Sequence, residues 1–145
     1  MMREPGVYII ESLGAMDFYK GRLDGHAAHE VLKIEKSHVQ YRIAIDLMRL
    51  KKAIAEAAGD SRFNILHLSC HGDFDGVELT SRKQIDWPGL ASILQMFAGP
   101  EKILVMSSCK GGNAGLTKAL EKKGIIFGWV FGATEDVGYT DSCLA

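Results

Sequence analysis

Residues 64–69 (NILHLS) form a short apolar run that ends in the triplet CHG of residues 70–72. Residues 102–108 (KILVMSS) form a second such run, which ends in the tetrapeptide CKGG of residues 109–112. Apolar runs of this length, bounded by glycine, are typical of strands buried inside a sheet. Between them, Asp86 begins a helical pattern that ends before Gly99. The order strand, helix, strand predicts two parallel strands joined by a crossover.

The N-terminal segments extend this pattern. Residues 7–12 (VYIIES) predict a first strand, and residues 30–34 (EVLKI) predict a short second one. Residues 15–28 have no clear period, and we expect a loop there.

An apolar stripe precedes the run at residues 64–69 and predicts a long amphipathic helix. Its members are Val39, Ile43, Leu47, Leu50, Ile54 and Ala57. Ser37 and Gln40 have the spacing of a capping box, and Gly59 is a natural end.

Towards the C-terminus, residues 77–80 predict a small accessory strand, residues 116–120 a short helix that stops at Gly124, and residues 125–132 a last strand. Alternating strands and helices predict an α/β fold of the Rossmann type, with helices on both faces of a mainly parallel sheet. We expect about five main strands in the order 2-1-3-4-5. A ligand site in such a sheet lies at the carboxyl ends of the central strands.

Composition narrows the class of protein. The 145 residues suit one domain, with 47% hydrophobic and 24% charged residues. The longest nearly apolar run, residues 124–133, is half the roughly 20 residues that a membrane-spanning helix needs. A net charge of −1 argues against a nucleic-acid binder, and three cysteines argue against a complete disulfide framework. The apolar run at residues 7–10 is too short for a secretory signal, so we expect a cytoplasmic protein.

His71 and Cys109 are the reactive side chains at the ends of the two central strands. A thiol acts as a nucleophile only as thiolate, and an imidazole on a neighbouring strand can take its proton. The backbone N–H groups of Gly72 and Cys109 are candidates for stabilising an oxyanion. Gly111 and Gly112 allow a tight turn from the strand into the next helix.

At these residues the sequence resembles the caspase-like (clan CD) cysteine peptidases, and within them bacterial CHAT-type domains. The matching pieces are the runs 66–72 (LHLSCHG) and 103–112 (ILVMSSCKGG), and the resemblance extends over residues 64–141. It implies one peptidase domain over residues 1–145, with a caspase-like three-layer sandwich. It also implies that His71 is the catalytic histidine, that Cys109 is the nucleophile, and that the backbone of Gly72 and Cys109 forms the oxyanion site.

Further expectations follow from the resemblance. The family's core sheet has six strands, so we expect the sixth to be missing from this chain. The segment 133–141 corresponds to one wall of the family's substrate groove. There Glu135, Asp136 and Asp141 are candidate substrate-binding residues, and they favour a basic residue before the scissile bond. The substrate is then a protein or peptide, an activating or regulatory protein partner is compatible with the family, and no cofactor or metal is expected.

Other interpretations remain open. Cys109 departs from the caspase signature because Ser108 and Lys110 flank it, so cleavage after aspartate is not expected. A caspase-like scaffold with a silent dyad is one alternative, and a phosphate- or nucleotide-binding turn over residues 107–115 is another. Cys70 is expected to be a core residue, and His67 to lie within its strand.

Overall fold

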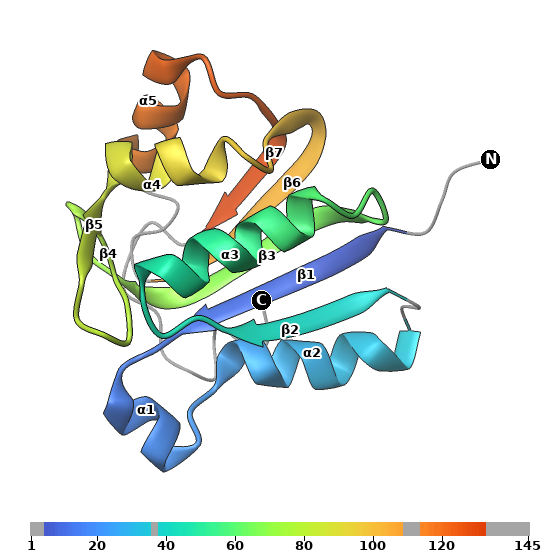
Figure 1. The fold of residues 1–145 in the computed structure, drawn as a ribbon, viewed down its shortest axis with the longest axis vertical. Helices are drawn as coiled ribbons and strands as arrows, with labels where there is room; N and C mark the ends of the chain where they lie inside the picture. The colour runs from blue at the N-terminus through green and yellow to red at the C-terminus, as the bar shows by residue number, and fades with distance from the viewer. Residues whose placement is uncertain (1–4, 36–37, 109–113, 133–145) are drawn as a thin grey trace.

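The computed structural model describes residues 5–35, 38–108 and 114–132, which form an α/β fold around a seven-stranded sheet (Figure 1). Five strands are parallel, in the order β2-β1-β3-β6-β7, and a short antiparallel hairpin, β4-β5, joins the end of β3. The bounds are β1 (Gly6–Ser12), β2 (Val39–Ile43), β3 (Phe63–Gly72), β4 (Gly76–Glu78), β5 (Gln84–Asp86), β6 (Gly99–Ser107) and β7 (Phe127–Gly132). This confirms the α/β class, the mainly parallel sheet and the order of its main strands.

Helices cover both faces of the sheet. They are α1 (Ala15–Lys20), α2 (Asp24–Glu35), α3 (Leu47–Ala58), α4 (Trp87–Leu94) and α5 (Ala114–Lys123). Successive side chains of a strand point to opposite faces. In β3, Leu66 and Leu68 belong to the core that α3, α4 and α5 cover, whereas Ser69 contacts the first residue of α2 on the other face. The arrangement is therefore a three-layer sandwich (Figure 1).

The long helix predicted from residue 39 to residue 57 is wrong over residues 39–46. Val39–Ile43 is strand β2, which pairs in parallel with β1, and the helix begins only at Leu47. Its N-cap is Asp46, whose carboxylate accepts a hydrogen bond of 2.9 Å from the Arg49 N–H. Ser37, the expected cap, lies outside the described residues.

The segment between β1 and β2 also differs from expectation. Residues 15–28, expected as a loop, contain α1 and the start of α2, and residues 30–34, expected as the second strand, form the C-terminal half of α2. In α2, only Gly25 is buried, so the helix has almost no apolar stripe that could identify it.

The elements after β3 follow the prediction closely. Asp86 caps α4 through a hydrogen bond of 2.7 Å from the Gly89 N–H, and Pro88 lies in its first turn. Gly124 ends α5 with a φ of +69°, a backbone conformation that glycine adopts without steric cost. The accessory strand expected at residues 77–80 is β4, which β5 completes as a hairpin. No helix in the described ranges is long and apolar enough to cross a membrane.

Candidate functional site

The site lies where β3 and β6 end side by side. These two strands are parallel neighbours, and Ser69 of β3 pairs with Ser107 of β6. His71 follows Ser69 by two residues, and Cys109 follows Ser107 by two residues. The expectation that the two strands are adjacent is therefore confirmed. Cys109 itself lies outside the described residues.

His71 stands at the exposed end of β3 and contacts a carboxylate. Its Nε2 atom lies 2.5 Å from Oδ2 of Asp17, and its side chain is 54% exposed. Asp17 belongs to α1, which begins directly after the turn that leaves β1. An ionised carboxylate only accepts hydrogen bonds, so this contact places the ring proton on Nε2 and leaves Nδ1 as the acceptor of a neutral ring.

Asp17 was not among the residues selected from the sequence. Its segment was expected to be a loop, and nothing in the spacing of residues 17 and 71 indicates a contact. The one available signal is an acidic residue shortly after the first strand, since the turn after a parallel strand lies at the same edge as the other carboxyl ends.

Gly72 is the last residue of β3 and pairs with Val77 of β4. The Asp73 N–H donates to the Gly76 carbonyl at 2.9 Å. Successive residue pairs along two antiparallel strands alternate between hydrogen-bonded and non-hydrogen-bonded pairs. Because Asp73 and Gly76 are hydrogen-bonded, the next pair, Gly72 and Val77, is not. The N–H of Gly72 is therefore not used in pairing with β4.

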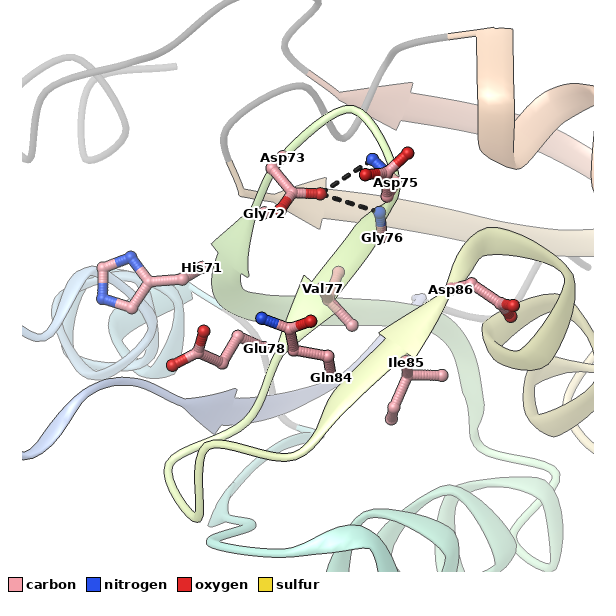
Figure 2. A pocket seen from close by; sticks show the side chains of 10 residues that line it. All are labelled: His71, Gly72, Asp73, Asp75, Gly76, Val77, Glu78, Gln84, Ile85 and Asp86. Carbon is pink, nitrogen blue, oxygen red and sulfur yellow. Dashed lines mark hydrogen bonds between the residues drawn. The ribbon is translucent and has the colours of Figure 1, made fainter.

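A pocket of about 300 Å³ lies between the end of β3 and the β4-β5 hairpin, while the imidazole of His71 extends away from that hairpin (Figure 2). The lining residues are His71, Gly72, Asp73, Asp75, Gly76, Val77, Glu78, Gln84, Ile85 and Asp86. Four of them carry carboxyl groups and none is a lysine or arginine, so the pocket has a negative potential.

Two of these carboxylates have structural partners. Asp73 accepts hydrogen bonds from the N–H groups of Asp75 and Gly76, which closes the turn into β4 (Figure 2). Asp86 caps α4. Much of the negative charge of the pocket is therefore explained by the local structure of the hairpin.

Glu11 of β1 pairs with Ser69 of β3 and is fully buried beneath the start of α2. Its carboxyl group accepts hydrogen bonds from the N–H groups of Gly25 and His26 and from the hydroxyl of Tyr41, at 2.6, 3.2 and 2.5 Å. Burial raises the pKa of Glu11, and the hydrogen bonds from Tyr41 and Gly25 oppose that shift. Burial and the hydrogen bond to Glu11 also raise the pKa of Tyr41.

Asp24, the first residue of α2, bridges β3 and β6. Its two carboxyl oxygens accept hydrogen bonds from Ser69 at 2.6 Å and from Ser107 at 2.5 Å. Ser69 lies two residues before His71, and Ser107 lies two residues before Cys109. Sequence reasoning missed Glu11 and Asp24, although a charged residue at the end of an otherwise apolar strand is a signal for Glu11.

Cys70 and His67 are internal residues, as expected. Cys70 is 3% exposed, and burial raises the pKa of its thiol to about 12, so it stays protonated and is a poor nucleophile. Burial lowers the pKa of His67, and its Nε2 atom has no hydrogen-bond partner within the described residues.

Among the described residues, no group of three or more histidine, cysteine, aspartate or glutamate side chains is placed to hold a metal ion.

The remaining candidates lie outside the described residues. They are the nucleophile Cys109 with Gly111 and Gly112, and the expected substrate-binding residues Glu135, Asp136 and Asp141. Most of the turn considered for phosphate binding, residues 107–115, lies there too. Compared with known proteins, the sequence matches no family model and no curated protein.

Proposed function

We propose that the chain is a cysteine endopeptidase of the caspase-like type, in which Cys109 and His71 form the catalytic dyad. The observation that carries the proposal is the adjacency of β3 and β6, in a register that pairs Ser69 with Ser107. Neighbouring strands of a sheet lie about 4.8 Å apart. Two residues separate each of the paired serines from His71 or Cys109, so the chain approaches both residues from neighbouring points of the sheet.

The reaction begins with transfer of the Cys109 thiol proton to Nδ1 of His71. The Cys109 sulfur then attacks the scissile carbonyl carbon, and the carbonyl electron pair moves onto its oxygen. The N–H groups of Gly72 and Cys109 stabilise that oxyanion. His71 protonates the leaving amine, and water hydrolyses the thioester to release the acid and restore the thiol.

Asp17 orients the imidazole in this scheme. A carboxylate on Nε2 fixes the tautomer whose Nδ1 can accept a proton, and it stabilises the imidazolium that forms. A basic residue before the scissile bond is the proposed specificity, because Glu135, Asp136 and Asp141 supply the negative charge of the proposed groove wall.

The direct test is site-resolved thiol labelling. Iodoacetamide is reacted with the full chain over a range of pH, and alkylation of each cysteine is read by peptide mass spectrometry. We expect Cys109 to react well below its ordinary pKa of about 8.5, and the buried Cys70 to serve as an unreactive internal reference. His71→Ala should slow the labelling of Cys109 at neutral pH. Equal, slow labelling of Cys109 in both proteins contradicts the dyad and favours a silent scaffold.

Asp17→Asn is expected to lower kcat for peptide cleavage by at least about 10-fold, because the amide no longer fixes the imidazole tautomer. KM should change little, since Asp17 contacts the imidazole and not the substrate. The measurement is steady-state cleavage of the best peptide from a positional library. Glu101→Gln, an exposed charge at the opposite edge of the sheet, is the control and should keep the wild-type kcat. An Asp17→Asn enzyme with unchanged kcat removes Asp17 from the mechanism.

A further inference from the structure

Two carboxyl groups and one hydroxyl group meet under the first turn of α2. Ser69 Oγ lies 2.9 Å from Oε2 of Glu11 and 2.6 Å from Oδ1 of Asp24. Glu11 and Ser69 are both fully buried. The three groups come from the end of β1, the end of β3 and the first residue of α2.

The hydroxyl of Ser69 lies within hydrogen-bond distance of both carboxyl groups, although it has only one proton to donate. A serine hydroxyl carries one proton, and an ionised carboxylate carries none. Ser69 can therefore donate to Glu11 or to Asp24, but not to both. If both carboxyls were ionised, a lone pair of the buried Ser69 would face a carboxylate oxygen at hydrogen-bond distance. A second proton removes this conflict, because one carboxyl group then donates to Ser69, which donates to the other.

The other donors around the junction are already directed elsewhere. Gly25 N–H and Tyr41 donate to Glu11, and Ser107 donates to the second oxygen of Asp24. None of these groups supplies a proton to the oxygen of Ser69. Among the donors in the described part of the chain, the remaining source of this proton is one of the two carboxyl groups.

Within residues 5–35, 38–108 and 114–132, no lysine or arginine is among the groups that act on the carboxyl of Glu11. In the part of the chain that the structure describes, the titratable residues that interact with the pair are Tyr41 of β2, His26 of α2, and His67 and Cys70 of β3. Tyr41 and Cys70 are protonated and neutral at pH 7, and burial lowers the pKa of His67, which favours its neutral form. His26 reaches Glu11 through its backbone N–H. Two charges bridged by one buried hydroxyl group, one of them on the fully buried Glu11, repel strongly.

We propose that Glu11 and Asp24 share one proton through Ser69 in the native protein at neutral pH, and that this proton holds the first turn of α2 on the ends of β1, β3 and β6. The inference concerns the buried junction and stands whether or not the chain is a peptidase.

The proposal sets the sign of a pH effect on stability. In the unfolded chain, a glutamate loses its proton near its ordinary pKa of 4.5. The native pair keeps its proton to higher pH, so the native state binds more protons above that value. Stability therefore falls as pH rises above about 4.5, and the penalty is complete once pH exceeds the native pKa of the pair.

The first test observes the proton directly. The full chain is labelled with ¹³C at the side-chain carboxyls of glutamate and aspartate, and NMR follows their shifts with pH. Spectra of Glu11→Gln and Asp24→Asn assign the two resonances. We expect the pair to retain one proton at pH 7, and to release it at higher pH. The backbone amide of Gly25 should shift with the same midpoint. Fully ionised shifts for both carboxyls at pH 7 overturn the proposal.

The second test uses Asp24→Asn, which removes one charge and keeps a side-chain oxygen that can accept from Ser69. Unfolding by urea is measured from about pH 5 to about pH 9. In the wild type, the unfolding equilibrium constant should rise by up to about 10-fold per pH unit while the pair keeps its extra proton. The variant should lose this component. Glu35→Gln removes an exposed charge at the other end of α2 and should keep the wild-type slope. Equal slopes in Asp24→Asn and the wild type also overturn the proposal.

Discussion

Replacement of Cys109 by alanine is expected to abolish peptide cleavage, with a fall in kcat of at least about 1,000-fold. Cys70, the one cysteine within the described ranges, cannot replace the Cys109 sulfur, because burial raises the pKa of its thiol to about 12. The loss of a covalent nucleophile removes the route through a thioester, and enzymes of this kind keep only the rate that binding and oxyanion stabilisation supply. The measurement is turnover of a peptide selected from a pooled library.

Folding must be unchanged for this result to be interpreted. Circular dichroism and the urea midpoint of Cys109→Ala should match the wild type. Cys70→Ser is not a suitable control because it places a hydroxyl group in the core. The better comparison is Cys143→Ala, which removes a thiol without any role in the proposed mechanism. Residual turnover of Cys109→Ala above a tenth of the wild-type value refutes the assignment of the nucleophile.

Leu66→Ala is expected to lower the free energy of unfolding by about 3 to 5 kcal/mol. Leu66 is fully buried in the central strand β3, where it pairs with Tyr8 of β1 and Leu104 of β6. Neighbours on both sides are fixed in the sheet and cannot close the cavity that the lost methyl groups leave. Urea denaturation at constant pH measures the change. Ile34→Ala, at a side chain that is 81% exposed, should change stability by less than about 0.5 kcal/mol. Similar effects of both substitutions would contradict the central position of β3.

The strands and helices after residue 60 were predictable because local signals agreed with the tertiary fold. Apolar runs, the Asp86 cap and Gly124 are short-range features. The apolar stripe that begins at Val39 gave a wrong prediction of helix. The four-residue spacing of Val39 and Ile43 fits a helix, but it also fits alternate positions of a strand. Residues 39–43 form a strand because they pair with β1. In this pairing Val39 lies opposite Val7, which is 32 residues earlier in the sequence.

The helices between β1 and β2 were not predictable for a different reason. α2 is held by hydrogen bonds from its Gly25 and His26 N–H groups to Glu11, and by Asp24 bonded to Ser69. These polar contacts to distant strands leave no apolar periodicity in the sequence of the helix. The same holds for the site: His71 is marked by its place at the end of a strand, whereas its partner Asp17 becomes visible only when α1 is placed in space.

The two tryptophans of the chain occupy opposite environments, and this makes them separate optical reporters. Trp87 is 3% exposed and its indole N–H donates to the Phe74 carbonyl, so its fluorescence should be blue-shifted and shielded from iodide. Trp129 is 66% exposed on β7, and iodide should quench it readily. In a Trp129→Phe protein, the emission of Trp87 alone would follow the junction of α4 with the hairpin, and could distinguish its local opening from global denaturation.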